Sequence, residues 1–293
     1  MLNVVSCSRD NVAEVGDELI GNPDVHGISF TGSTAVGSKV AARAGGLLKK
    51  CCVELGGKDA LIVLDDADIV RAVNAATFGS FMHQGQICMS VERIIVHEAI
   101  ADEFTEKLVA NTMKLRVGDP RQMANCIGPV INATQLKKIR DQVDEAIAAG
   151  ATLLCGGKNQ GLFFEPTVLG NVTRDMRVFR EETFGPVAPI IRARDDNEAI
   201  EIANDSDYGL SAGIMTQNEE RGLSIAQRLR TGMAHINDSS INDEPHVPFG
   251  GIGASGLGRH GGKPGIDTFT ELRWITLERG GRHYPPPFLM SPH

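Results

Sequence analysis

Residues 27–64 read GISFTGSTAVGSKVAARAGGLLKKCCVELGGKDALIVL, and this stretch shows the alternation of strands and helices most clearly. Residues 27–31 form a short apolar run bounded by glycines, which predicts a strand. Residues 33–44 have the pattern of a helix, and residues 51–54 and 60–64 are further apolar runs of strand length. Strands separated by helices and short connections indicate a parallel sheet covered by helices, so the predicted fold class is α/β.

The same alternation continues on both sides of this stretch. Residues 3–6 look like the end of a strand, and residues 11–20 have helical apolar spacing. Residues 245–265 are rich in glycine and are predicted to be irregular. The remaining pattern predicts helices at 68–82, 99–115, 132–149, 197–203 and 219–229, and strands at 93–96, 188–192, 212–215, 234–237 and 269–277.

The composition excludes several classes of function. Charged residues make up 23% of the 293 residues and the net charge is −8, so we expect no basic face for nucleic acid or an anionic membrane. The longest strongly apolar run, at 60–64, is far too short to cross a bilayer. The first ten residues lack the pattern of a signal peptide, so we expect a cytoplasmic protein.

Cysteine and histidine usage does not predict a metal site. The eight histidines form no H-E-x-x-H motif and no Cys/His cluster, so the sequence predicts no zinc ligands. In a cytosolic chain the cysteines are expected to be reduced thiols, most of them packed as small apolar residues. The six are Cys7, Cys51, Cys52, Cys88, Cys126 and Cys155.

Two glycine-containing stretches are candidates for ligand contact. In FTGSTAVG (residues 30–37), Ser33 and Thr34 stand at a helix start, where free N–H groups and the helix dipole favour phosphate. An ordinary capped turn is the alternative. In VELGGKDALIV (residues 53–63), Glu54 stands in an apolar run, where burial would raise its pKa and make it a general base. A surface glutamate at a strand end is the alternative there.

Cys88 lies in GQICMS (residues 85–90), on a connection between a predicted helix and a predicted strand. Connections held by rigid elements are where catalytic residues concentrate, and a thiolate there could attack a carbonyl carbon. A small core residue is the alternative. EETFGPV (residues 181–187) indicates a turn that leads into a strand. GLSAG (residues 209–213) fits the serine-hydrolase pattern, but a strand rather than a helix follows it, which argues against that function.

Taken in order, these stretches resemble the aldehyde dehydrogenase superfamily. FTGSTAVG, VELGGK, GQICMS, EETFGPV and PFGGIGASGLGRHGG follow the family's order, and Glu54 and Cys88 stand at the family's usual interval of 34 positions (88 minus 54). The resemblance runs from about residue 3 to residue 277. HQGQICMS, INDSSINDEPHVPFGG and FTELRWITL look most like members that oxidise aromatic aldehydes such as benzaldehyde, vanillin or salicylaldehyde.

The resemblance implies roles for individual residues. Cys88 matches the nucleophile, which forms a thiohemiacetal and then a thioester with the aldehyde. Glu54 matches the base that activates water to hydrolyse the thioester to the carboxylic acid. Phe249 belongs to the stretch beside the substrate channel, and NAD or NADP is the implied cofactor. The positions that match cofactor contacts are Gly32, Ser33, Leu55, Gly56, Gln135, Lys138, Glu182 and Phe184.

The resemblance also implies the domain organisation. Residues 1–56 match the C-terminal part of a Rossmann-like dinucleotide-binding domain, residues 57–265 match the α/β catalytic domain, and residues 266–293 match an oligomerisation strand and tail. A homodimer or homotetramer is the implied assembly. The match covers only the C-terminal three-fifths of the family pattern, so we expect an N-terminally truncated chain. The alternatives are an inactive subunit with a binding role or none, and a CoA-acylating member, against which Glu54 argues.

Overall fold

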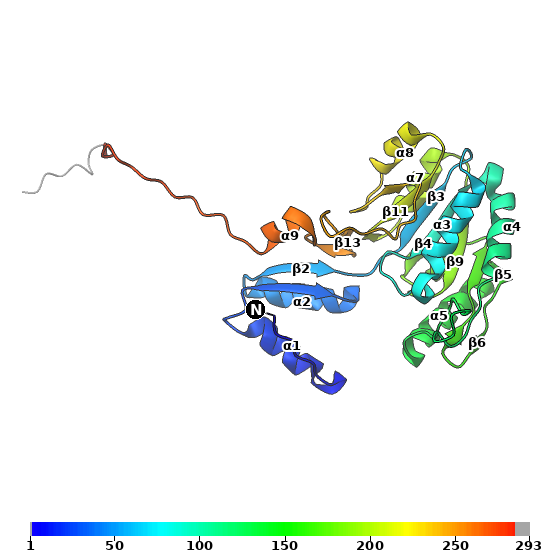
Figure 1. Ribbon diagram of the computed structural model, residues 1–293, viewed down its shortest axis with the longest axis horizontal. Coiled ribbons are helices and arrows are strands. Elements are labelled where there is room, and N and C mark those ends of the chain that lie inside the picture. The colour runs from blue at the N-terminus through cyan, green and yellow to red at the C-terminus, as the bar shows by residue number, and fades with distance from the viewer. Residues whose placement is uncertain (1, 285–293) are drawn as a thin grey trace, which may run out of the picture.

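The computed structural model of the protein describes residues 2–284 and contains two parts built around sheets (Figure 1). The larger part is a seven-stranded sheet with helices on both faces. The smaller part is a three-stranded sheet against which α2 (Thr34–Gly46) packs, and α1 (Val12–Gly21) packs on α2. After α9 (Gly262–Thr268) the chain, as far as residue 284, extends away from both parts (Figure 1).

The large sheet has the strand order β12-β11-β3-β4-β9-β8-β5, and every pair is parallel except β5–β8. This arrangement confirms the predicted α/β class. All five residues of β3 (Asp59–Val63) are buried, as expected for a strand covered on both faces. Its partners are β4 (Val91–His97), β5 (Thr152–Cys155), β8 (Thr167–Gly170), β9 (Val187–Ala193), β11 (Ala212–Met215) and β12 (His235–Ile236).

Two apolar cores lie on opposite faces of the large sheet, because successive strand residues point to opposite sides. Leu61 and Val63 pack with residues of α3 (Ile69–Phe81) and α4 (Ala101–Thr112). Ala60 and Ile62 belong to the other core. That second core includes residues of α5 (Ala133–Ala148), α7 (Asp196–Asn204) and α8 (Glu219–Ala226).

Capping side chains fix where several helices begin, close to the predicted positions. Asp68 accepts a hydrogen bond from the Arg71 amide at 3.1 Å at the start of α3. Asn132 accepts one from the Gln135 amide at 2.9 Å at the start of α5. Such caps satisfy amides that have no partner within the helix. No helix in residues 2–284 is long and apolar enough to span a membrane.

The small sheet has the order β1-β2-β14, formed by β1 (Gly27–Thr31), β2 (Lys50–Glu54) and β14 (Gly256–Leu257). β1 and β2 are parallel, whereas β14 joins β2 antiparallel. The stretch at 27–64, whose alternation indicated a parallel sheet, contributes parallel strands to two sheets, β1 and β2 to the small one and β3 to the large one. The apolar pattern specifies each strand, but it does not specify which strand is its neighbour.

Two predicted strands are absent from the described residues. Residues 3–6 form no strand, and residues 269–277 form none either, with Leu272 and Trp274 more than 90% exposed. A strand requires a hydrogen-bonding partner, and neither segment pairs with another within residues 2–284. The tail at 285–293 lies outside the described residues. The shorter elements are η1 (Arg9–Asn11), η2 (Met82–Gly85), η3 (Glu98–Ile100), β6 (Asn159–Gln160), β7 (Phe163–Phe164), α6 (Arg177–Arg180), β10 (Tyr208–Gly209) and β13 (Ile252–Gly253).

Candidate functional site

A turn with unusual backbone geometry carries Cys88 between α3 and β4. His83, Gln84 and Gly85 all have positive φ, at 51°, 58° and 66°. Positive φ is uncommon outside glycine, so three such residues in succession mark a conformation that the surrounding structure holds. A Cβ on Gly85 would lie 2.2 Å from the Gly185 carbonyl oxygen. Gly85 is therefore required for this turn to pack against the 181–187 stretch.

Glu54 ends β2 and lies next to Cys88. The residue is 3% exposed, and Oε1 of its carboxyl group has no hydrogen-bond partner among the described residues. Burial raises the pKa of Glu54 to about 7; the interaction with the Cys88 side chain opposes this rise and the charge of Glu182 adds to it. A carboxyl group with a pKa near neutrality can take a proton from a neighbouring group or from water.

The Cys88 thiol has a pKa well above its usual value. Burial is the largest cause, and the negative charges of Glu54 and Asp59 add to it. At neutral pH the sulfur therefore holds its proton, although the thiolate is the nucleophilic form. Positive charge brought into the pocket would lower the pKa of the thiol and favour the thiolate.

The start of α2 forms one side of the same site. Ser33 is the N-cap residue, but no side chain within residues 2–284 caps the first turn, and Thr34 Oγ1 donates to the Ala254 carbonyl at 2.9 Å instead. The Val36 amide donates to the Ser33 carbonyl at 3.1 Å, so the amides of Thr34 and Ala35 are the ones that remain available for an anion. A Cβ on Gly37 would lie 2.1 Å from Leu55 Cδ2, so only glycine lets α2 approach Leu55 this closely.

The 181–187 stretch and α5 form the opposite side. Gln135 Nε2 donates to the carbonyl oxygens of Thr183 and Phe184, both at 2.8 Å. Glu182 Oε1 accepts a hydrogen bond from the Gly57 amide at 3.1 Å. Burial, followed by the charge of Glu92, raises the pKa of Glu182 to about 7, and the Gly57 hydrogen bond opposes this rise.

One pocket of about 390 Å³ brings these groups together. Every residue predicted from the sequence for catalysis or cofactor contact lines it, together with Thr31. Phe249 is not among the lining residues; it is half-buried and pairs with His260 through two backbone hydrogen bonds. The lining residues are Thr31, Gly32, Ser33, Glu54, Leu55, Gly56, Cys88, Gln135, Lys138, Glu182 and Phe184.

The sequence did not predict a buried ion pair behind this pocket. Lys58 Nζ lies 2.7 Å from Glu92 Oε2, and the two side chains are 0% and 3% exposed. Both residues stand in or beside apolar strand runs, GGKDALIV and SVERIIV. A charged residue inside such a run is the signal that could have identified them, since buried charges are almost always paired.

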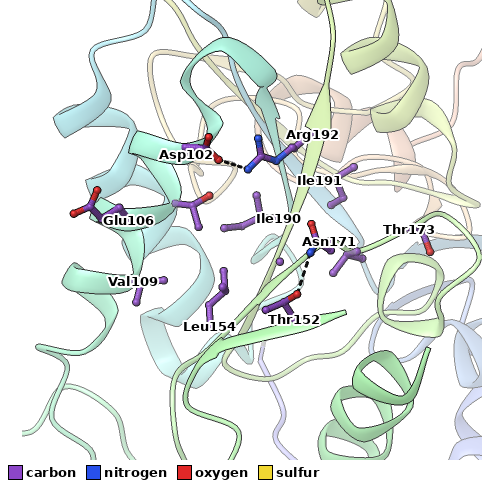
Figure 2. A pocket seen from close by; sticks show the side chains of 13 residues that line it. Asp102, Glu106, Val109, Thr152, Leu154, Asn171, Thr173, Ile190, Ile191 and Arg192 are labelled. Atoms are coloured by element: carbon purple, nitrogen blue, oxygen red, sulfur yellow. Dashed lines mark hydrogen bonds and ion pairs between the residues drawn. The ribbon is translucent and has the colours of Figure 1, made fainter. Parts of the chain in front are cut away.

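A second pocket of about 710 Å³ lies between α4 and strands β5, β8 and β9 and contains none of the predicted residues (Figure 2). Arg192 pairs with Asp102, and Asn171 Nδ2 donates to Thr152 Oγ1 at 3.0 Å. These polar groups satisfy one another, and the lining includes no cysteine or histidine. Across the described residues, no group of three His, Cys, Asp or Glu side chains could hold a metal ion.

The fold and the site define an α/β protein in which a cysteine and a buried glutamate meet beside an uncapped helix start. The model of the aldehyde dehydrogenase family matches residues 1–275, and the chain belongs to this family.

Individual relatives agree with this assignment. The chain is 45% identical over 285 residues to a vanillin dehydrogenase of Pseudomonas fluorescens, covering 97% of this chain and 59% of that protein. It is 47% identical over 274 residues to an NAD⁺-dependent benzaldehyde dehydrogenase of Pseudomonas putida, covering 93% of this chain and 56% of that protein. A salicylaldehyde dehydrogenase structure from Pseudomonas putida G7, complexed with salicylaldehyde, superposes with a TM-score of 0.91 at 46% identity, over 95% of this chain and 58% of that one. The chain thus spans less than three-fifths of the length of these relatives.

Proposed function

We propose that the protein oxidises an aldehyde, most favourably an aromatic one, to the carboxylic acid with NAD or NADP as acceptor. The observation that carries this proposal is the meeting of Cys88 and Glu54 in one pocket with all the predicted cofactor-contact residues. The names of the relatives support the aromatic substrate class, because they act on vanillin, benzaldehyde and salicylaldehyde.

The residues present fit a dinucleotide. Gly32 and Ser33 lie at the uncapped start of α2, where the amides suit a pyrophosphate. Glu182 offers a carboxylate to ribose hydroxyls, and Leu55 and Gly56 provide an apolar wall and a close backbone approach. Lys138 lies on the α5 side of the same pocket. NAD or NADP, when bound, supplies the hydride acceptor that allows the carbon on Cys88 Sγ to reach the oxidation level of a thioester.

Cys88 begins the reaction by forming a bond between Sγ and the aldehyde carbon. The carbonyl electron pair moves to oxygen, so the thiohemiacetal oxyanion needs hydrogen-bond donors, each typically contributing about 3 kcal/mol. The backbone amide of Cys88 is one such donor. The proton of the thiol leaves to solvent as the Sγ–carbon bond forms, and Glu54, whose pKa is about 7, acts in the second half of the reaction.

Glu54 then acts on water. The water loses a proton to the carboxylate, its oxygen attacks the thioester carbon, and the C–S bond breaks to release the acid and the Cys88 thiolate. A pKa of about 7 makes the carboxylate available above that pH while leaving it basic enough to accept the proton. Asp or Glu groups exposed to water are much weaker bases.

The remaining roles follow the same proposal. Phe249 lies beside the substrate channel, and the protein acts in the cytoplasm. Residues 1–56, 57–265 and 266–293 are the end of the cofactor domain, the catalytic domain and the oligomerisation segment. The exposed Trp274 and Ile275 support a homodimer or homotetramer in which this segment pairs with another copy. Sedimentation of Trp274→Glu beside the wild type tests this assembly.

The proposal is tested by measuring NADH or NADPH formation with benzaldehyde, salicylaldehyde and vanillin. The wild type is expected to form the reduced cofactor and the matching acid in equal amounts, and Cys88→Ala is expected to form neither. Cys126→Ala is the matched control, since Cys126 is exposed and lies outside this pocket. Activity that survives Cys88→Ala, or no reduced cofactor with any aldehyde, would contradict the proposal.

A further inference from the structure

We propose that Glu92 and Lys58 form a positioning pair that fixes the turn at Thr183 and Phe184, and thereby the cofactor side of the pocket. The expected effect on cofactor binding rests on the proposed function, whereas the fixing of the turn rests on side-chain contacts with its backbone. Neither residue lines the pocket. Both would act through Glu182 and Phe184, which do.

Glu92 binds two successive backbone amides with its two carboxylate oxygens. Thr183 N donates to Oε2 at 2.7 Å, and Phe184 N donates to Oε1 at 2.7 Å. Hydrogen bonds to an ionised acceptor are about twice as strong as neutral ones. Two adjacent amides held by one group fix the position and the direction of the peptide between them.

Lys58 pairs with the Glu92 carboxylate in a buried place. Its Nζ lies 2.7 Å from Glu92 Oε2 and donates to Thr183 Oγ1 at 3.1 Å. Thr183 Oγ1 in turn donates to Gln142 Oε1 at 2.7 Å. A buried charge without a partner is costly, so the ammonium group of Lys58 stabilises the carboxylate group that binds the two amides.

The turn adopts a conformation that it would not hold unaided. Phe184 has φ of 52°, which is rare for a residue with a bulky side chain. The carbonyls of Thr183 and Phe184 both accept from Gln135 Nε2 at 2.8 Å, so side chains bind all four backbone polar groups of these two residues. The elements concerned are β4 and α5, with Lys58 directly before β3.

The position of this turn determines the position of the groups beside it. Glu182 precedes it and reaches Gly57 N at 3.1 Å, and a Cβ on Gly56 would lie 2.6 Å from Glu182 Oε1. The carboxylate of Glu182 therefore sits in a narrow space between the turn and the Gly56–Gly57 backbone. A shift of the turn would move Glu182 and the Phe184 ring away from the cofactor side of the pocket.

The test compares Glu92→Gln with the double variant Lys58→Gln/Glu92→Gln. Glutamine has the shape of glutamate but only one acceptor oxygen, so it cannot bind both amides. Glu92→Gln also leaves Lys58 unpaired, which destabilises the fold. The double variant removes that unpaired charge and regains stability, but it still lacks the second acceptor. If Glu92→Gln alone does not fold, the double variant carries the measurement.

The first readout is hydrogen exchange of the Thr183 and Phe184 amides, which does not depend on activity. We expect exchange at these amides to be faster by about 10-fold or more in both variants. The second readout is KM for NAD or NADP, expected to rise by about 10-fold while kcat changes less. The control is Glu198→Gln, because the Glu198 carboxylate also accepts a backbone amide, Arg194 N at 2.7 Å, outside the pocket.

The outcomes separate this inference from the proposed function. Unchanged exchange at both amides in a folded variant would overturn the positioning role, whatever the enzyme's activity. Restoration of both exchange and KM to wild-type values in the double variant would also overturn it, because the pair would then serve stability alone. Fast exchange with no effect on KM would show that the turn is not on the cofactor side and would refute the consequence drawn from it.

Discussion

The two sheets of this molecule differ in how completely they are buried. In β3 of the large sheet all five residues are buried, and α3 and α4 place six and four residues in the interior. In the small sheet no residue of β1 is fully buried, and α1 has no buried residue at all. The pocket lies between them, with Glu54 and Ser33 from the small sheet side and Cys88 and Glu182 from the large one.

This difference shows that the apolar cores of the large sheet stabilise the side of the pocket that carries Cys88 and Glu182. The Cys88 turn and the 181–187 stretch adjoin β4 and β9, in which nearly every residue is buried, whereas α2 packs on β2 and on β1, which has no fully buried residue. Exposed apolar residues such as Val4, Val12 and Leu19 gather on the less buried side. We therefore expect Cys88 and its turn to be rigid and the α2 side of the pocket to be more mobile.

The largest expected effect is on the free energy of unfolding, which should fall much more for a substitution in the large part than for one in the small part. Phe104 is fully buried in α4, so Phe104→Ala is expected to lower the free energy of unfolding by about 3–5 kcal/mol because it leaves a cavity. Val12 in α1 is 58% exposed, and Val12→Ala should change it by no more than about 0.5 kcal/mol. Urea unfolding measures both. Similar losses for the two variants would remove the distinction between the regions.

The next effect concerns Glu54, which is buried where the two regions meet. In the folded protein the pKa of Glu54 is raised from 4.5 to about 7. The contribution of this carboxyl group to the free energy of unfolding is therefore fully present below pH 4.5 and is lost as the pH rises through 7. Glu54→Gln should remove this loss, which for a shift of this size is at most about 3 kcal/mol between pH 4.5 and pH 8.

Urea unfolding of Glu54→Gln and wild type across that pH range measures the difference. The pKa of Glu198 is lowered rather than raised, so Glu198→Gln is a control that should not reproduce the gain at pH 8. Parallel pH profiles for wild type and Glu54→Gln would show that the Glu54 carboxyl is not held in a desolvated place.

The smallest effect concerns the reactivity of the Cys88 thiol. The charge of Glu54 contributes to its raised pKa, so Glu54→Gln should lower that pKa and speed alkylation by iodoacetamide at pH 8 by up to about tenfold. Peptide mass spectrometry reports Cys88 and the exposed Cys126 in the same sample. The Cys126 rate should stay constant. Slower alkylation of Cys88 in the variant would mean that Glu54 does not oppose its ionisation.

Much of the large sheet could be predicted from the sequence, because apolar periodicity and capping residues act locally. The strand predicted at 212–215 matches β11, and Asp68 and Asn132 cap helices near their predicted starts. The division into two sheets could not be predicted in this way. Strand pairing depends on contacts between distant residues, such as those of β3 with β11, and periodicity does not report them.

The candidate site was also predictable in its main residues, because their motifs lie in a family order. The sequence did not identify Lys58 and Glu92, because each is a single charged residue in or beside an apolar strand run. A charge in a strand run is equally compatible with a solvent-facing position, and only the fold shows that Glu92 faces the Thr183 and Phe184 amides. The strand prediction at 269–277 was wrong for another reason. The apolar pattern of this segment suits a strand, but no strand within residues 2–284 pairs with it.

The acyl state of Cys88 reports whether Cys88 and Glu54 act as nucleophile and base. p-Nitrophenyl benzoate delivers the same benzoyl thioester without any hydride step, so peptide mass spectrometry after mixing isolates these two residues. We predict that the benzoyl group accumulates on Cys88 in Glu54→Gln, turns over in the wild type, and is absent from Cys88→Ala. An unmodified Cys88 in Glu54→Gln, or loss of the benzoyl group as fast as in the wild type, would contradict the account.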